Sequence, residues 1–525
     1  MSLARRTIGQ VQICCGMALA LSVAIPSGAR AQVQLPATFS DQLVMSQLYF
    51  PTTMAFLPDR RLVVAERQGT LRLIVEGKLG AVDPFGVVDS VAIASSRQGL
   101  LGVAIDPGWP ARPYVYVGYD AADQTVRVSR YTAVGDLTHG TSVDLALDPG
   151  SRHDVLRGMP NPGLANGIGA LRFGPDGKLY VSLSDADEAC TVQDSAAWRG
   201  VVLRLDPDGV PAGGGPPPSR ASLVPGDNPR AGHPNANIAL LWSMGFKNPF
   251  RFHLDPYSGA LYVGDQGDQF YQEIDRIQGG GTNNGWPLFE GPELRDPPCP
   301  VNDTEVYATP IHSYLDRAPS GEALVVDGGI YHPNACSNCS FPPEYAGDYF
   351  FSDYFAGFLR RLHFDGTSWS LAAPVSGQPS SSDWGRGFAG VSDFVTAPDG
   401  ALWYVQNGDG GPNGEVHRIF HVPPTGAVPA PRPASASFAP PYPSPARDRV
   451  RFAYTLFAAA RVDLELFDIG GRLVERVVSA ARQEAGEHRA TWSGRMAGGR
   501  ATPGVYLARL RVDGVTFERR VLLIP

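Results

Sequence analysis

A turn followed by a short strand recurs six times along the first three quarters of the chain, and this repeat restricts the possible folds more than any other feature. Each copy passes through a turn with Pro or Gly into β-branched and aromatic residues, as in Phe173-Gly-Pro-Asp-Gly-Lys-Leu-Tyr-Val. Proline fixes φ, glycine accepts positive φ, and Leu-Tyr-Val favours a strand. The copies begin near Phe56, Ile105, Phe173, Leu254, Tyr345 and Ala397.

A single hairpin of this kind cannot bury its apolar face, whereas a closed ring of small sheets can. The high content of Gly (60) and Pro (47), without a three-residue period, fits a turn-rich β protein. The repeat therefore predicts an all-β fold, a six-bladed β-propeller over residues 32–422, with an array of β-sandwiches as the alternative.

A stretch rich in Pro, Ala and Ser, residues 423–440, separates this region from a shorter one. Such a composition is typical of an extended linker. Beyond it, the runs that begin at Arg449, Ala460 and Gly504 alternate apolar and polar residues, and a last strand is expected from Phe517. Residues 441–525 are predicted to form a small Ig-like β-sandwich.

The first 31 residues have the pattern of a secretory signal. Arg5 and Arg6 precede an apolar run from Ile13 to Ile25, and Ala29-Arg30-Ala31 forms a small-residue cleavage site. We therefore expect export to the periplasm, the cell surface or the extracellular space. An uncleaved membrane anchor is the alternative, although the apolar run is short for a membrane span.

The remaining composition restricts the partners. The net charge is −8, so charge alone gives no basis for binding nucleic acid or anionic lipid. After the signal, no apolar run approaches the length of a membrane span, so we expect no transmembrane segment in the mature chain.

Four cysteines follow the signal, and export makes disulfides the first interpretation. Cys336 and Cys339 lie in one loop and can form a local bridge, which leaves Cys190 and Cys299 as the second pair. A zinc site built from all four cysteines is the alternative, although the sequence has only one Cys-x-x-Cys pair after the signal.

Residues from about 45 to 420 resemble the soluble quinoprotein glucose/sorbosone (aldose sugar) dehydrogenases and their hedgehog-interacting-protein-like relatives. The resemblance rests on several motifs in a fixed order, which begin at Arg97 (Arg-Gln-Gly-Leu-Leu-Gly), Phe173 (Phe-Gly-Pro-Asp-Gly), Gly245 (Gly-Phe-Lys-Asn-Pro-Phe-Arg-Phe), Gly264 (Gly-Asp-Gln-Gly-Asp) and Asn283 (Asn-Asn-Gly-Trp-Pro). Residues from about 441 are similar to the Ig-like domain of flagellar hook-capping proteins and to type IX secretion sorting modules, on motifs such as Leu466-Phe-Asp-Ile-Gly-Gly-Arg. This second resemblance implies contact with secretion machinery or the cell surface.

The first resemblance implies a six-bladed propeller that binds pyrroloquinoline quinone (PQQ) and Ca²⁺ and oxidises a sugar hydroxyl by hydride transfer to the quinone. Such chemistry needs a base beside the reacting carbon, donors for the oxygens of the reduced quinone, and oxygen ligands for the cation. By position, the resemblance assigns cofactor binding to Gln98, Lys247, Asn248 and Gln266. It assigns calcium binding to Gly267, Asp268, Glu273 and Asn284.

Several positions depart from the family pattern. The residue at the position of the catalytic histidine is Asn166, which cannot titrate and cannot act as a general base. Positions that carry cofactor-binding cations in the family are Phe355, Gly390 and Ser392 here. These departures predict weak or absent PQQ-dependent glucose oxidation.

Two functions therefore remain open at the level of sequence. The first is an exported PQQ-dependent sugar dehydrogenase whose catalytic residue is unknown. The second is a propeller without redox chemistry that binds a glycan or a protein outside the cell. Family resemblance alone does not decide between them.

Overall fold

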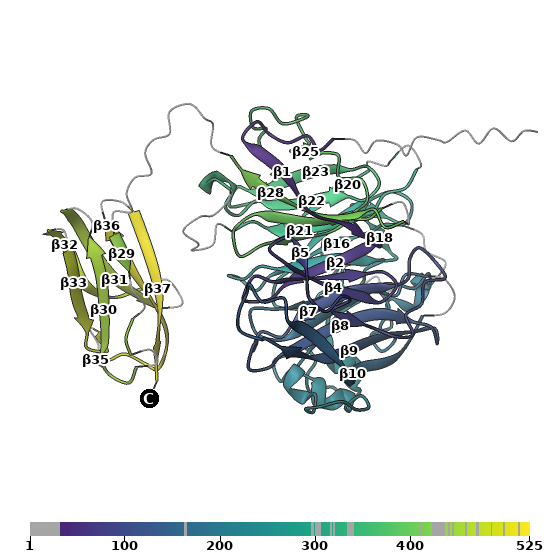
Figure 1. Ribbon diagram of the computed structural model, residues 1–525, viewed down its shortest axis with the longest axis horizontal. Helices are drawn as coiled ribbons and strands as arrows, with labels where there is room; N and C mark the ends of the chain where they lie inside the picture. Colours follow the sequence, from purple (N-terminus) through teal and green to yellow (C-terminus); the bar gives the residue numbers. More distant parts are fainter. Residues whose placement is uncertain are drawn as a thin grey trace, which may run out of the picture. The chain divides into compact units, whose positions relative to one another are not determined.

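The structure, a computed structural model, divides into two compact units, residues 1–422 and 423–525 (Figure 1). We describe each unit by itself. The residues described are 32–161, 165–295, 299, 306–315, 318, 321–332, 341–408, 411–422, 436–438, 441–443, 446–456, 459–468, 472–484, 486–496, 499–512 and 515–524. No helix in these residues is long and apolar enough to cross a membrane.

The first unit is built from antiparallel sheets, with three short 3₁₀ segments and one α-helical turn, α1 (Ala236–Ala239), in the loops between residues 189 and 239 and a fourth 3₁₀ segment at residues 343–345. Six of its sheets have at least four strands among the described residues. The first three sheets consist of β2 (Pro51–Phe56), β3 (Leu62–Glu66), β4 (Thr70–Val75), β5 (Lys78–Leu79) and β6 (Gly86–Val87); of β7 (Leu100–Ile105), β8 (Tyr114–Ala121), β9 (Thr125–Gly135) and β10 (Leu145–Pro160); and of β11 (Ile168–Phe173), β12 (Leu179–Leu183), β13 (Val201–Leu205) and β14 (Leu241–Met244).

The other three sheets follow the same pattern of hairpins. They consist of β15 (Pro249–Leu254), β16 (Leu261–Asp265), β17 (Gln272–Ile277) and β20 (His312–Tyr314); of β21 (Val325–Ile330), β22 (Tyr349–Asp353), β23 (Phe358–Phe364), β24 (Trp369–Leu371) and β25 (Gly385–Arg386); and of β26 (Val391–Thr396), β27 (Leu402–Gln406), β28 (Gly414–His421) and β1 (Phe39–Leu48). A small hairpin, β18 (Phe289–Glu290) and β19 (Glu293–Leu294), lies outside them.

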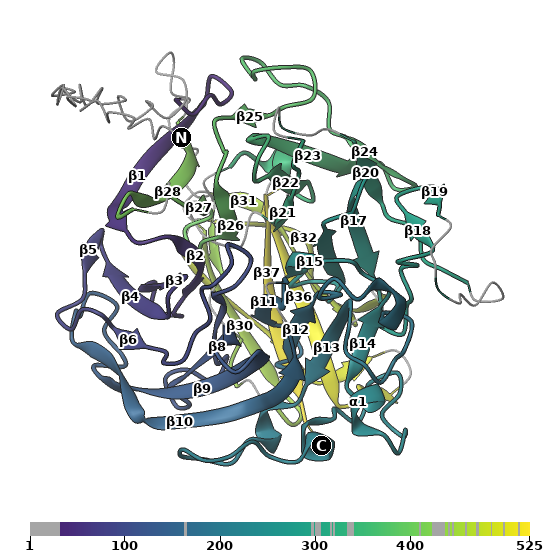
Figure 2. The same cartoon turned by 90° about the vertical axis from the view of Figure 1, so that its right-hand side faces the viewer.

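The first strands of the six sheets form a closed ring. β2 contacts β7, β7 contacts β11, and the contacts continue through β15, β21 and β26 back to β2. Figure 2 shows the ring viewed approximately down its axis, with the sheets arranged around that axis. The apolar residues of the unit lie mainly between neighbouring sheets, in successive clusters that each join two sheets.

The sixth sheet joins the two ends of the unit. Its outer strand, β1, comes from the start of the described chain and pairs antiparallel with β28, from Phe39 opposite His421 to Leu48 opposite Gly414. Phe39 also packs edge-on against Phe341 and Trp384. The ring is therefore closed by backbone hydrogen bonds between segments at opposite ends of the first unit.

A buried guanidinium group fills the axis of the ring. Arg251 on β15 donates hydrogen bonds to the carbonyl oxygens of Thr52 on β2, Leu101 on β7, Gly169 on β11 and Ser392 on β26. Its side chain is 1% exposed, and burial lowers its pKa to about 10, so it stays charged at neutral pH. One side chain thus links five of the six central strands.

A second charged group, Asp393, lies beside this guanidinium, with a distance of 3.8 Å between the Arg251 Nε and a carboxylate oxygen. Asp393 also accepts hydrogen bonds from Arg172 and from the Thr53 hydroxyl, each at 2.7 Å. Burial opposes ionisation of this carboxyl, but the charges of Arg172 and Arg251 outweigh it and hold its pKa below the usual range. The polar groups on the axis therefore satisfy one another.

Five of the six sequence repeats begin at the end of the first strand of a sheet, and the fifth, at Tyr345, begins just before the second strand β22. Phe56, Ile105, Phe173 and Leu254 end the first strands, and Ala397 directly follows one. The turn glycines Gly177 and Gly400 have φ values of 73° and 78°, as the Pro-Asp-Gly motif predicts. The all-β prediction is confirmed.

The second unit has two main sheets over one core. One contains β29 (Ala436–Phe438), β30 (Val450–Leu456) and β33 (Gly486–Trp492), and the other contains β32 (Leu473–Gln483), β31 (Ala460–Asp468), β36 (Gly504–Val512) and β37 (Val515–Leu523). A hairpin, β34 (Arg495–Met496) with β35 (Gly499–Arg500), adds to them. Apolar residues of both sheets, including Phe452, Leu464 and Leu510, form the shared core.

The structure changes one predicted boundary. The segment 423–440 was expected to be linker throughout, but β29 lies inside it and pairs with β30. The alternation of Ala436-Ser437-Phe438 is too short to stand out from the surrounding Pro, Ala and Ser. The predicted signal (1–31) and the pair Cys336 and Cys339 lie outside the described residues.

Candidate functional site

One end of the ring gathers most of the residues assigned from the sequence. In each sheet the first residue of the inner strand pairs with the last residues of the second strand, as Pro249 does with Asp265. Backbone hydrogen bonds then link these ends to one another, for example Leu100 N–H to the Arg67 oxygen and Asp185 N–H to the Lys247 oxygen. The loops at this end form the candidate site.

Contacts connect the predicted residues Asn166, Lys247, Asn248 and Gln266. The Ser184 hydroxyl donates to the carbonyl oxygen of Asn166, and the next residue, Asp185, donates its N–H to Lys247 at 2.8 Å. The Asn248 amide donates to the Gln266 side chain at 2.7 Å, and the Gln266 amide donates to the Ala323 carbonyl at 2.8 Å. These residues therefore line neighbouring parts of the same end of the ring.

Gln98, the remaining predicted cofactor residue, lies on the loop before β7 and is buried. Its neighbour Gly99 donates an N–H to Asp120 at 3.3 Å, and Asn161 donates to the other oxygen of that carboxylate at 2.9 Å. Burial raises the pKa of Asp120 to about 7, although these hydrogen bonds oppose the shift. Gln98 thus lies near a carboxyl group that titrates close to neutral pH.

The cations that the family pattern places at three positions are absent, but another cation is present. The Phe355 N–H donates to the Asp353 carboxylate at 2.9 Å, Gly390 is a turn residue, and the Ser392 hydroxyl donates to the Thr52 carbonyl at 2.9 Å. Arg67, after β3, donates from Nε to the Gln98 carbonyl at 2.8 Å. Sequence analysis missed Arg67 because it lies outside the motifs.

Two buried carboxylates surround the main-chain turn at Lys247. Asp265 accepts the N–H groups of Lys247 and Asn248 at 2.9 and 2.7 Å, and Asp185 accepts the Trp286 indole N–H at 3.1 Å. Burial raises the pKa of Asp185, and the Lys247 charge partly opposes this shift. Burial likewise raises the pKa of Asp265 to about 7. Sequence analysis missed both groups.

The residues assigned to calcium lie on the segment 267–273 and at Asn284, and most of the oxygens around them accept protein hydrogen bonds. The loop 267–271 wraps around Glu290, whose Oε1 accepts the N–H of Asp268 at 2.7 Å, and Glu273 accepts the N–H of Gly291. Asn284 instead donates to Ser243 and Met244 at 2.9 Å. The described residues contain no group of three His, Cys, Asp or Glu side chains arranged to hold a metal ion.

Cys190 and Cys299 lie beside one another near this end of the ring, next to a cavity of about 490 Å³ that Trp286 and Arg295 also line. Burial and the neighbouring Cys190 thiol raise the pKa of Cys299 to about 11. Both are free thiols in the structure. The two side chains interact, and the disulfide between them stays a prediction.

The raised pKa of Asp265 predicts a specific pH dependence of stability. Below pH 4 the Asp265 carboxyl is protonated in both the folded and the unfolded chain. Between pH 4 and 7 it ionises only in the unfolded chain. The free energy of unfolding therefore falls by up to about 1.4 kcal/mol for each unit by which the pH rises. Asp265→Asn removes this contribution. Denaturant unfolding measures the free energy of unfolding of Asp265→Asn and of the wild type at each pH. We expect the variant to gain stability relative to the wild type from pH 4 to pH 7, and the difference to stay constant above pH 7. A difference independent of pH would contradict the assignment.

Comparison with known proteins agrees with this architecture. Residues 48–417 match the profile of the glucose/sorbosone dehydrogenase family. This match covers more than half of the chain, which therefore belongs to the glucose/sorbosone dehydrogenase family.

Individual relatives support the same conclusion. The chain is 30% identical over 255 residues to the aldose sugar dehydrogenase YliI of Escherichia coli, covering 48% of this chain and 63% of that protein. It is 28% identical over 276 residues to quinoprotein glucose dehydrogenase B of Acinetobacter calcoaceticus, covering 48% and 53%. The match thus spans less than two thirds of each. The PQQ-bound aldose sugar dehydrogenase of Streptomyces coelicolor shares the fold, with a TM-score of 0.52, 23% identity, and coverage of 74% and 99%.

Proposed function

We propose that the chain oxidises a sugar hydroxyl and passes the hydride to a bound quinone at the end of the ring that carries Lys247. The observation that carries this proposal is the presence of two cations, several amides and buried carboxylates at that end, in a member of the glucose/sorbosone dehydrogenase family. We further propose that the six sheets are the blades of a six-bladed propeller, closed by β1.

The donor set of the site fits an anionic, planar cofactor such as PQQ. Lys247 and Arg67 supply positive charge, and Gln98, Asn248 and Gln266 supply amide groups, on loops at the same end of the ring. When bound, the quinone would supply the hydride acceptor. The lysine and arginine would hold its carboxylates, and the amides would orient it through hydrogen bonds.

The proton of the sugar hydroxyl needs an acceptor other than Asn166. We propose Asp185 as this acceptor. Asp185 follows Ser184, whose hydroxyl donates a hydrogen bond to the Asn166 carbonyl, and the Lys247 charge stabilises its carboxylate. Its buried carboxylate is held by the Trp286 indole and by the N–H of Asp187 at 3.0 Å. Burial moves the pKa of the Asp185 carboxyl upwards, towards neutral pH, and a general base is most effective when its pKa is near the working pH.

Binding of the cofactor can be tested at Lys247. Replacement by methionine keeps most of the side-chain volume but removes the charge, and loss of one charge-assisted hydrogen bond costs about 1.5–3 kcal/mol. We expect Lys247→Met to weaken PQQ binding by roughly 10–100-fold, measured by fluorescence titration with and without Ca²⁺.

The matched control for this experiment is Lys178→Met. Lys178 follows the Pro-Asp-Gly turn between β11 and β12, at the other end of the ring, and pairs with Asp206 at 2.7 Å. We expect the affinity of Lys178→Met for PQQ to equal that of the wild type. Equal affinity of Lys247→Met and the wild type would show that the quinone binds elsewhere.

We also propose that the chain is exported and that residues 441–525 form an Ig-like module for sorting or surface attachment. The support is the signal-like sequence of residues 1–31 and the two packed sheets of the second unit. Calcium remains part of the proposal through Gly267, Asp268, Glu273 and Asn284. Fractionation of cells that express a chain ending at residue 422 tests the sorting role, because the shortened chain should lose surface attachment.

A further inference from the structure

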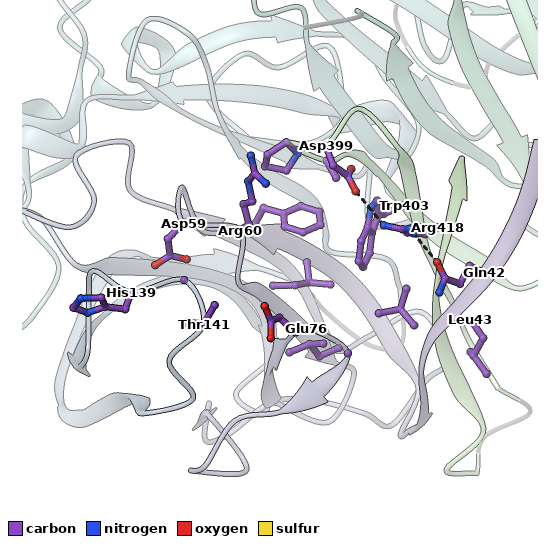
Figure 3. A pocket seen from close by; sticks show the side chains of 18 of the residues that line it. Gln42, Leu43, Asp59, Arg60, Glu76, His139, Thr141, Asp399, Trp403 and Arg418 are labelled. Atoms are coloured by element: carbon purple, nitrogen blue, oxygen red, sulfur yellow. Dashed lines mark hydrogen bonds and ion pairs between the residues drawn. The ribbon is translucent and has the colours of Figure 1, made fainter. Parts of the chain in front are cut away.

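A large cavity lies at the opposite end of the ring from the candidate active site. It occupies about 790 Å³ between the first and sixth sheets and is bounded by the β2–β3 turn, the β26–β27 turn and the ring-closing strand β1 (Figure 3). These turns join the ends of the inner strands that lie far from Lys247. The cavity is therefore separate from the proposed site of oxidation.

The cavity has an aromatic wall. Phe56 and Trp403 line it and pack edge-to-face with their ring centroids 5.2 Å apart. A neighbouring cavity of about 410 Å³ shares Phe56, Ala397 and Pro398 with it. The two hollows therefore adjoin, and their volumes of about 790 and 410 Å³ leave room for more than one small ring.

Polar side chains surround the aromatic wall. Arg418 donates to Gln42 at 2.8 Å and pairs with Asp399 at 3.3 Å, and Figure 3 shows these three side chains along one side of the cavity. Arg60 and Glu76, both exposed, line another part. Guanidinium donors and carboxylate acceptors are thus both present beside the apolar wall.

Three carboxylates, two guanidinium groups and His139 line the cavity. Asp399 pairs with Arg418, and Asp59 pairs at 2.7 Å with Arg61, which lies behind the lining. Arg60 and Glu76 remain as exposed charges of opposite sign, so the lining has no cluster of like charge to select a phosphate, a carboxylate or a metal ion. It fits a ligand that is uncharged and rich in hydroxyl groups.

We propose that this cavity binds a neutral oligosaccharide, separately from the oxidation site. A sugar ring has apolar C–H faces and a rim of hydroxyl groups. Burial of such a face against Phe56 and Trp403 is favourable, while guanidinium, carboxylate and amide groups bond the rim. A glycan held here would keep the protein on a polysaccharide while the other end of the ring oxidises soluble or terminal sugars.

The backbone of the cavity supports a dedicated role. Arg60 and Glu76 have φ values of 78° and 50°, in the left-handed region that non-glycine residues seldom adopt. Both are turn residues whose side chains line the same hollow. Two of the nine described non-glycine residues with positive φ thus line this cavity, and residues held in this region often occur at ligand sites.

The proposal is tested by calorimetric titration of the full chain, without PQQ, with neutral hexasaccharides of β-1,4-linked glucose, α-1,4-linked glucose and β-1,4-linked xylose. We expect binding of at least one of them. Because a lost hydrogen bond to a charged group costs about 1.5–3 kcal/mol, the exposed-residue variant Arg60→Ala should weaken this binding by roughly 10–100-fold. Trp403→Leu should weaken it further, and Arg60→Ala serves as the variant that keeps the fold if Trp403→Leu does not.

Arg157→Ala, at an exposed site outside the cavity, is the matched control and should bind like the wild type. Absence of binding to all three hexasaccharides, or binding that Arg60→Ala leaves unchanged, would overturn the proposal. Binding lost in Lys247→Met but kept in Arg60→Ala would assign the glycan to the oxidation site instead. Because the titration needs neither PQQ nor turnover, its outcome is independent of the proposed dehydrogenase activity.

Discussion

Replacement of Arg251 by methionine should lower the free energy of unfolding of the first unit by about 3–5 kcal/mol. The substitution leaves four carbonyl oxygens of other strands without their buried donor and removes one of the two guanidinium groups near Asp393. Guanidinium denaturation followed by tryptophan fluorescence measures this loss. Arg251→Lys should recover little of it, because one ammonium group cannot reach carbonyls on four different strands.

Arg97→Met is the matched control for Arg251. Its side chain is 54% exposed and its only described ion pair, with Asp187, is 3.4 Å long. Exposed pairs of this kind contribute about 0–1 kcal/mol, so the variant should unfold close to the wild type. Similar midpoints for Arg251→Met and Arg97→Met would show that the axis does not depend on the guanidinium group.

Asp185→Asn should reduce the turnover of an aldose by about 10²–10⁴-fold, the usual contribution of a general base. The asparagine keeps the size of the side chain and can still accept the Trp286 indole hydrogen bond, so PQQ affinity should change little. Dye-linked oxidation with PQQ and Ca²⁺ measures the turnover. The acidic limb of the pH profile of turnover should disappear with the carboxylate, because that limb reports its protonation.

Asp187→Asn provides the comparison for Asp185. This residue lies two positions further along and its carboxylate is exposed and paired with Arg97. Its replacement removes a nearby negative charge without touching the proposed proton acceptor, so turnover should fall less than about threefold. Retained turnover and an unchanged pH profile in Asp185→Asn would show that another group accepts the proton.

The fold was predictable where the signal is local. The Pro-Asp-Gly turns at Gly177 and Gly400 and the apolar strands beside them occur within short stretches of sequence, so the all-β character of the first unit was predictable. The pairing of β1 with β28 was not predictable in this way, because Phe39 and His421 are brought together only by ring closure. The short strand β29 was missed inside a segment rich in Pro, Ala and Ser.

The candidate site was predictable through its motifs, which placed Lys247, Asn248 and Gln266 near one another. The carboxyl groups of Asp185 and Asp265 were missed because their raised pKa values come from burial between sheets, which no local pattern reveals. Arg251 lies inside a motif, yet its role depends on carbonyls of strands that are far away in the sequence. Properties that arise from packing across the ring needed the structure.

The pairing of the first strand with the last sheet also sets an order of assembly. A chain made or translocated from its N-terminus presents β1 long before β28 exists, so β1 waits without its partner while the other sheets form. Closing this long loop has an entropic cost that is repaid only at the end, which makes ring closure a late event in folding. A chain that stops before Gly414 keeps the edges of β1 and β27 open to pairing with other chains. Complete synthesis of the first unit is thus a condition for its solubility.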